Sequence, residues 1–134
     1  SSVEGIHCSH VIEHFQPLDV HKILSEFNRV LAPKGVLVIR SPLLWHGFYS
    51  DLTHVRPYNP KVIIKYLTPS EQRTYSQISF DFKVVYLKWR YREFVSENRH
   101  IIVFLNMLNR LRLPLFGKTG YMLVLRKTAG SMSI

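Results

Sequence analysis

Two imidazoles and a carboxylate lie within five positions near the start of the chain, at His10, Glu13 and His14. On a helix, two histidines four positions apart can bind a zinc ion from one face, and a glutamate beside them can act as a general base. The surroundings do not favour that arrangement, because Pro17 follows closely and no clear downstream acidic helix supplies a third ligand. We therefore expect no metal here. In the plainer alternative, both histidines satisfy backbone groups in a loop.

A second group of polar side chains lies in the segment DLTHVRPYNP, which brings together an acid, an imidazole, a fixed cation and a phenol at Asp51, His54, Arg56 and Tyr58. The guanidinium of Arg56 could hold a carboxylate or phosphate through two parallel hydrogen bonds. Alternatively, the segment is a structural brace, with Asp51 paired to Arg56 and Tyr58 packed beneath the loop. The sequence leaves both interpretations open.

The first group is positioned by the stretch from Gly5 to Arg40, whose pattern predicts a strand, a loop, a helix, a turn and a second strand. The first strand is a short apolar run at Gly5 to Cys8. From Asp19 to Leu31 apolar residues recur at helical spacing, and the turn formers Ala32 to Gly35 end the helix. Val36 to Ile39 is a continuous aliphatic run, typical of a strand buried on both faces. The pattern predicts a βαβ unit with parallel strands.

The second half of the chain predicts two helices and two strands. An Asn-Pro cap precedes a helix over Lys61 to Leu67. Alternation then predicts a strand from Phe80 to Arg90. One face of that strand would consist of Phe80, Phe82, Val84 and Tyr86. Ile101 to Leu113 predicts a helix with a wide buried stripe or, alternatively, an interfacial helix that contacts a membrane or a partner. Tyr121 to Arg126 predicts a final strand.

Length and composition indicate one folded domain. A chain of 134 residues, 46% of them apolar, can bury about two thirds of its unfolded surface. The formal charge is +9, from 18 basic and 9 acidic residues. The basic residues are scattered among apolar ones, which is typical of an ordinary solvated surface. Nucleic-acid binding is the least supported class, because no motif for it is present.

The sequence also bears on compartment. No apolar run approaches the ~20 residues that span a bilayer, and no signal sequence opens the chain. Cys8 is the only cysteine, so no internal disulfide can form, which fits a reducing compartment. We expect a cytoplasmic protein. Because the chain starts with Ser1 and enters a strand almost at once, we also expect a piece of a longer protein.

Three stretches in order carry a family resemblance: HCSHVIEHF, EFNRVLAPKG and VLVIRSP. They resemble the second half of class I S-adenosylmethionine-dependent methyltransferases, and the resemblance is good from Val3 to Leu67. It implies an α/β fold: a partial Rossmann-like sheet of about four strands, the last one antiparallel, with flanking helices. The domain would span residues 1–128, with a frayed tail at 129–134. The family's glycine-rich cofactor loop would lie upstream of Ser1, so we expect the isolated chain to be inactive without that cofactor-binding half.

The resemblance also implies roles for both polar groups. The cofactor-binding residues, at a strand tip facing the cofactor's methyl group, would be Cys8, Ser9 and His10. The catalytic residues, orienting or deprotonating an acceptor hydroxyl, would be His10, Glu13 and His14. The segment DLTHVRPYNP resembles one found in a subset of the family associated with saccharide or lipid modification. The acceptor-binding residues would then be Asp51, His54, Arg56 and Tyr58.

Three functions follow as hypotheses. The first is an S-adenosylmethionine-dependent methyltransferase, or its acceptor-side half, acting on a small molecule, a saccharide or a lipid headgroup. The second is a non-catalytic module that kept the fold and binds or regulates. The third is a basic nucleic-acid-binding domain. Because the strand at Gly5 to Cys8 would form an exposed sheet edge, we also expect a homodimer through it.

Overall fold

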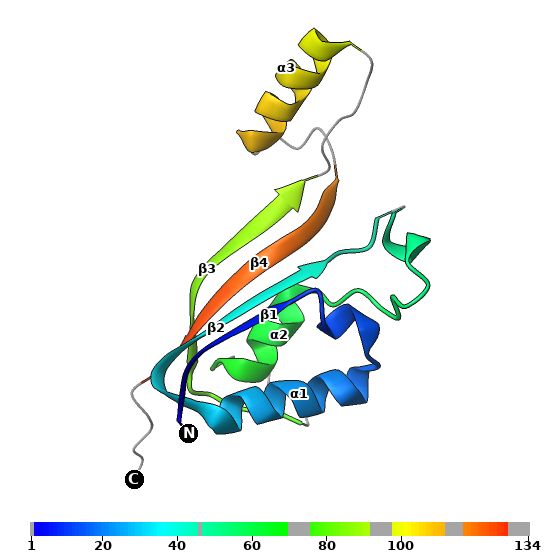
Figure 1. Cartoon of the computed structure of the whole chain (residues 1–134). Coiled ribbons are helices and arrows are strands. Elements are labelled where there is room, and N and C mark those ends of the chain that lie inside the picture. The colour runs from blue at the N-terminus through cyan, green and yellow to red at the C-terminus, as the bar shows by residue number, and fades with distance from the viewer. Residues whose placement is uncertain (1, 46, 70–75, 92–97, 112–116, 129–134) are drawn as a thin grey trace.

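The computed structural model describes residues 2–45, 47–69, 76–91, 98–111 and 117–128. The described chain forms four strands, three α-helices and two short 3-10 helices (Figure 1). In chain order these are β1 (Val3–Ser9), η1 (Ile12–His14), α1 (Pro17–Val30), β2 (Leu31–Pro42), η2 (Phe48–Ser50), α2 (Pro60–Leu67), β3 (Phe82–Tyr91), α3 (Arg99–Arg110) and β4 (Lys118–Lys127). The tail predicted to be frayed, 129–134, lies outside the described residues.

The four strands form one mixed sheet in the order β1-β2-β4-β3. β1 and β2 are parallel, while β4 is antiparallel to both β2 and β3. The last strand in the chain is therefore inserted between two earlier ones, and the carboxyl ends of β1, β2 and β3 meet the start of β4 at one edge. The predicted α/β class, four-strand count and antiparallel last strand are confirmed.

The β1-α1-β2 unit begins where Pro17 opens α1, a position at which its missing N–H costs no hydrogen bond. The helix ends one residue earlier than predicted, because Leu31 is already the first residue of β2. The helix end is held by Lys127 of β4, whose Nζ donates to the carbonyls of Asn28 at 2.6 Å and Leu31 at 2.9 Å. A cation at this point also suits the negative end of the helix dipole.

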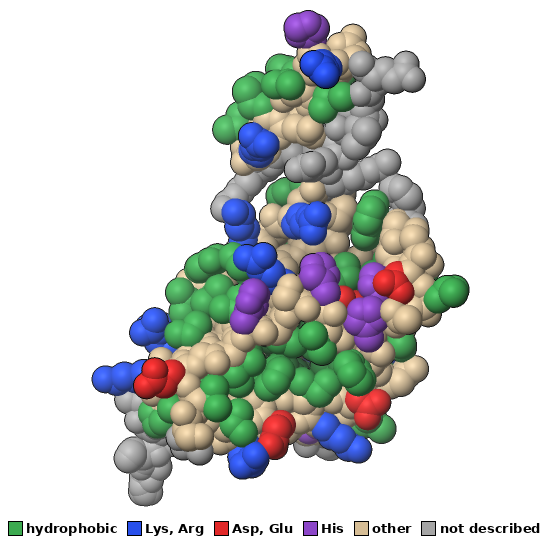
Figure 2. All heavy atoms as spheres, viewed as in Figure 1, with side chains coloured by type: hydrophobic (Ala, Val, Ile, Leu, Met, Phe, Trp, Pro, Cys, Tyr) green, Lys and Arg blue, Asp and Glu red, His purple; other side chains and the backbone are tan. Residues whose placement is uncertain are grey.

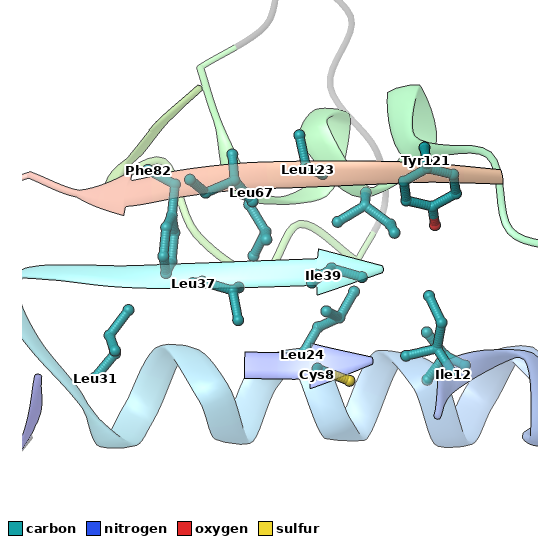
Figure 3. Close-up of a cluster of buried hydrophobic side chains, with 13 residues drawn as sticks. Cys8, Ile12, Leu24, Leu31, Leu37, Ile39, Leu67, Phe82, Tyr121 and Leu123 are labelled. Atoms are coloured by element: carbon teal, nitrogen blue, oxygen red, sulfur yellow. The ribbon is translucent and has the colours of Figure 1, made fainter. Parts of the chain in front are cut away.

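The core lies between the sheet and the two helices α1 and α2. The two helices contact each other through His21 and Tyr66, whose ring centroids are 5.9 Å apart. Cys8 of β1 and Leu24 of α1 lie close to each other in this core (Figure 3). The sheet contributes side chains from its inner strands as well. Fully buried members are Leu37, Ile39, Leu123 and Leu125. One face of the sheet is thus fixed by helices, which sets the position of its carboxyl edge.

Two expectations for the second half were wrong. A bulge in β3 shifts its register between Val84 and Tyr86, so Tyr86 does not continue the face of the buried Phe82. Leu87 and Trp89 pack on the core instead, because the inserted residue reverses the alternation. The wide buried stripe of α3 is also absent: Val103 is 67% and Phe104 55% exposed. Figure 1 shows α3 beyond the ends of β3 and β4, apart from α1 and α2.

No helix among the described residues is long and apolar enough to cross a membrane, as the sequence predicts.

Candidate functional site

A buried carboxylate is the centre of the candidate site. Glu13 lies in η1, directly after the carboxyl end of β1, and its side chain is 0% exposed. Its backbone carbonyl accepts hydrogen bonds from the amides of Val55 at 2.8 Å and Arg56 at 3.3 Å. Its Oε2 accepts a hydrogen bond from the hydroxyl of Ser41, at the end of β2, at 3.2 Å. Glu13 therefore joins β1, β2 and the 51–58 segment.

Three imidazoles surround the other carboxylate oxygen of Glu13. Nδ1 of His10 and Nε2 of His14 each lie 3.6 Å from Oε1, and Nε2 of His54 lies 4.0 Å from it. The rings of His14 and His54 are 4.9 Å apart between centroids. Oε1 itself has no hydrogen-bond partner among the described residues. Figure 2 shows histidine side chains grouped beside acidic ones on this face.

The two histidines that flank Glu13 are anchored through their Nδ1 atoms. Nδ1 of His54 lies 2.6 Å from the carbonyl oxygen of Phe48. Nδ1 of His14 lies 3.1 Å from the carbonyl oxygen of Thr53 and 2.9 Å from its hydroxyl. Because a carbonyl can only accept, each Nδ1 carries the proton. In the neutral imidazoles, both Nε2 lone pairs therefore face Glu13.

The 51–58 segment is braced, but not by the predicted pair. Asp51 accepts hydrogen bonds from the amide of Thr53 at 2.8 Å and from its hydroxyl at 2.6 Å, and these hold the pKa of Asp51 below its usual value. Its Oδ2 lies 3.8 Å from Nε2 of His54. Arg56 is exposed and makes no ion pair within the described part of the chain. Tyr58 is half-buried and donates to the carbonyl of Phe15 at 2.7 Å.

A pocket of about 740 Å³ opens beside this cluster, at the carboxyl edge of the sheet. It is reached by His10 and His54 from the cluster and by Arg40 and Ser41 from the end of β2. Other parts of its wall are aromatic or basic. These residues are Trp45, Phe48, Lys88, Trp89, Arg90 and Tyr121. Nζ of Lys118 lies 4.0 Å from the centroid of the Trp89 ring, which adds a cation to this aromatic side.

Of the residues predicted to bind the cofactor, only His10 lines the pocket. Its φ of 56° is left-handed, and its amide donates to the carbonyl of Arg40 at 3.0 Å, so the chain turns sharply at the tip of β1. Ser9 is half-buried. Cys8 is 5% exposed and belongs to the core, where burial and then the charge of Glu13 raise the pKa of its thiol.

Sequence reasoning missed part of the pocket wall. Trp89 and Arg90 lie in the last positions of β3, and only this place at the carboxyl end of the strand distinguishes them. Tyr121 is 4% exposed, and burial strongly raises the pKa of its hydroxyl. Ser41 was visible only as the residue that ends a strand. The available signal was that ligands bind at the carboxyl ends of parallel strands.

Comparison with known proteins agrees with this geometry. A family model described as a methyltransferase domain matches residues 1–39. The chain is similar to a crystal structure of a SAM-dependent methyltransferase from Archaeoglobus fulgidus, with 23% sequence identity and a TM-score of 0.60. The similarity covers 94% of this chain and 60% of that one, so this chain spans about 60% of the length of the protein it matches. Comparison with curated protein sequences gives no significant match.

The chain therefore has a class I methyltransferase-like α/β fold. Its first strand, helix and second strand carry the sequence signature of the methyltransferase domain. The resemblance drawn from the sequence is confirmed at that level.

Proposed function

We propose that the chain is the acceptor-side part of an S-adenosylmethionine-dependent methyltransferase. The observation that supports this most is the pocket at the carboxyl edge of the sheet, lined by aromatic and basic side chains and bordered by His10. In open α/β sheets this edge is where ligands bind. The methyltransferase-like fold and the family match over residues 1–39 make methyl transfer the matching chemistry.

The described residues fit the reacting end of S-adenosylmethionine. When bound, that cofactor supplies an electrophilic methyl group on a positively charged sulfur. Aromatic faces attract such a cation, and Trp45, Phe48 and Trp89 line the pocket. The rest of the cofactor would lie against the carboxyl end of β1, at Ser9 and His10.

The basic residues of the pocket indicate which acceptors it suits. Arg40, Lys88 and Arg90 line it together. A guanidinium binds a carboxylate or phosphate through two parallel hydrogen bonds, and a lysine supplies a further positive charge. We therefore propose a small molecule, a saccharide or a lipid headgroup that bears an anionic group. The predicted clamp, Arg56, does not line this pocket.

The candidate base is His10. Methyl transfer to a good nucleophile needs mainly positioning, whereas a hydroxyl acceptor must also lose its proton. The His10 side chain is 59% exposed, lines the pocket, and has Nδ1 3.6 Å from the buried carboxylate of Glu13. A proton taken by His10 would create an imidazolium that this carboxylate stabilises.

The test joins this chain to the upstream cofactor-binding half that the resemblance implies, and measures transfer of labelled methyl from S-adenosylmethionine. The acceptors are saccharides, lipid headgroups and small phenols, each with and without a phosphate or carboxylate. We expect transfer to anionic acceptors only. His10→Gln should lower kcat by about 100-fold, as loss of a general base does, and leave KM nearly unchanged. Arg90→Gln should instead raise the acceptor KM. His100→Gln, on α3, is the matched control and should change neither.

Binding of anionic acceptors without any transfer would contradict the catalytic proposal and favour the second hypothesis, a non-catalytic binding module. Equal transfer to neutral and anionic acceptors would contradict the role of the basic residues.

We also propose a homodimer through β1. Among the described strands β1 pairs only with β2, so it forms one edge of the sheet. An unpaired edge can add a strand from a second chain. One chain has a mass of 15.8 kDa, and light scattering at high concentration should give twice that mass. A monomer at every concentration tested would refute the dimer.

A further inference from the structure

We propose that Glu13, His14 and His54 form a binding site for one divalent transition-metal ion, with zinc as the best match. The three side chains each present a ligand atom, and these atoms lie within 4.8 Å of one another. Two imidazole nitrogens and a carboxylate oxygen are a ligand set that zinc uses in proteins. The site is independent of methyl transfer, since it rests only on the geometry of these three residues.

The hydrogen bonds of the two histidines point to a metal. Both Nδ1 atoms are committed to backbone carbonyls, of Thr53 for His14 and of Phe48 for His54. The hydroxyl of Thr53 donates to Asp51 and therefore accepts from His14. Backbone acceptors on Nδ1 are the usual support of metal-binding histidines, because they fix the tautomer that exposes the Nε2 lone pair.

The distances to Glu13 fit a metal better than hydrogen bonds. Oε1 lies 3.6 Å from Nε2 of His14 and 4.0 Å from Nε2 of His54, both beyond hydrogen-bonding range. Metal bonds of 2.0–2.1 Å in a tetrahedral site place ligand atoms about 3.3 Å apart. Oε1 would have to move about 0.3 Å closer to Nε2 of His14 and about 0.7 Å closer to Nε2 of His54. The three ligand atoms, which lie within 4.8 Å of one another, would draw together around the ion.

The burial of Glu13 supplies an independent reason. Its side chain is 0% exposed, and Oε1 has no hydrogen-bond partner within the described residues. A buried carboxylate oxygen without a partner is costly, and two neutral imidazole lone pairs facing it do not relieve the cost. A divalent cation between the three atoms would satisfy all of them at once.

The site joins two segments that the sequence separates. His14 and Glu13 belong to η1, and His54 belongs to the loop after η2, where it also lines the pocket. A bound ion would tie this loop to the tip of β1 beside the pocket. The proposed ligands therefore differ from the pair weighed in the sequence: Glu13 is a ligand in place of His10, and His54 lies 40 residues downstream of His14. Oδ2 of Asp51, 3.8 Å from Nε2 of His54, is a nearby further oxygen.

The test uses the whole chain without a histidine tag, stripped with a chelator and titrated with Zn²⁺ by calorimetry and with Co²⁺ by visible absorption. We expect one ion per chain and intense cobalt bands, which report a site of low coordination number. His54→Gln and Glu13→Gln should each weaken Zn²⁺ binding by at least about tenfold. Thr53→Val removes a hydroxyl contact of His14 but keeps the Thr53 carbonyl, so it should weaken binding by about tenfold and by less than the loss of a ligand.

His100→Gln is the matched control, because it removes an exposed imidazole from α3 and should leave the affinity unchanged. The wild-type titration decides the proposal even where a variant fails to fold. Absence of stoichiometric Zn²⁺ binding by the wild-type chain would overturn it. Equal losses in His54→Gln and His100→Gln would also overturn it, because they would show binding to surface imidazoles in general.

Discussion

The polar cluster around Glu13 and the helix α3 differ in what they bury: the cluster buries a charged side chain, whereas α3 exposes apolar ones. In the cluster, charged and polar groups are held by short backbone contacts around a fully buried carboxylate. Its members are His10, Glu13, His14, Asp51, Thr53 and His54. In α3, apolar side chains that would suit a core are exposed. These include Ile101 at 47%, Val103 at 67%, Phe104 at 55% and Met107 at 47%.

This difference teaches that hydrophobicity alone does not place an element in the core. β1, α1 and β2 are adjacent in the chain and can bury their apolar faces against one another directly. α3 has the same kind of periodicity, but Figure 1 shows it beyond the end of the sheet, where none of the other helices lies beside it. Figure 2 shows the apolar side chains of this helix at the surface. Its residues should therefore contribute little to the stability of the chain.

The largest difference in stability is expected between the hydrophobic core, which supports the polar cluster, and α3. Leu123→Ala removes a side chain that is 0% exposed and should cost about 2–5 kcal/mol of unfolding free energy. Phe104→Ala, on α3, should cost no more than about 0.5 kcal/mol. Urea unfolding followed by circular dichroism measures both. A loss above about 2 kcal/mol for Phe104→Ala would break the comparison, because it would show that α3 is packed.

The next effect concerns the end of α1. Lys127→Met removes the ammonium that donates to the carbonyls of Asn28 and Leu31, and should cost about 1.5–3 kcal/mol because the lost hydrogen bonds are charge-assisted. Arg110→Met, in the last turn of α3, is the control and should change stability by less than about 0.5 kcal/mol. Denaturation midpoints that fall equally in the two variants would argue against a specific cap.

A smaller effect is expected at the brace of the 51–58 segment. Tyr58→Phe removes the hydroxyl that donates to the carbonyl of Phe15 and should cost about 0.5–1.5 kcal/mol. Tyr49→Phe, at a ring that is 60% exposed, should be neutral. Thermal unfolding of the two variants compares them directly. No difference between them would mean that the segment is not held through Tyr58.

The smallest expected effect concerns the reactivity of the Cys8 thiol. Burial and the neighbouring charge of Glu13 raise the pKa of the Cys8 thiol, so the reactive thiolate is scarce in the folded chain near pH 8. We expect slow reaction with a disulfide reagent when folded and rapid reaction in urea. The pKa of the Cys8 thiol is higher in the folded chain than in the unfolded chain. The stability that the neutral thiol contributes is therefore complete below the pKa of the unfolded chain, and it is lost as the pH rises from that pKa through the folded one. Fast labelling of the folded chain would show that β1 opens readily.

The sequence predicted the strand, helix and strand from Gly5 to Arg40 because their contacts are local and their apolar periodicity is regular. It did not predict the bulge in β3. One inserted residue leaves the composition of the strand almost unchanged, but it moves every later side chain of the strand to the opposite face of the sheet. It also missed the pocket wall at Trp89 and Tyr121. Those residues meet because β3 and β4 pair in a register that places Trp89 opposite Tyr121, and the bulge in β3 sets that register.

The candidate site was predicted only in part, because the sequence shows local spacing but not contacts between distant segments. His10, Glu13 and His14 were singled out from their spacing, and His54 from its company in a polar loop, but no pattern linked the two groups. Their contact depends on the hydrogen bonds from the amides of Val55 and Arg56 to the carbonyl of Glu13, which lies more than 40 positions earlier in the chain. Such long-range backbone contacts leave no periodic signal in a single sequence.

The most direct test of the claim that the carboxyl edge is the functional centre is a nuclear magnetic resonance titration of the labelled chain with S-adenosylhomocysteine. We predict shifts in the amides of His10, Ser41 and Tyr121 and in the indole of Trp89, with the amides of α3 unchanged. Shifts confined to α3, or no shift at any ligand concentration, would contradict the account.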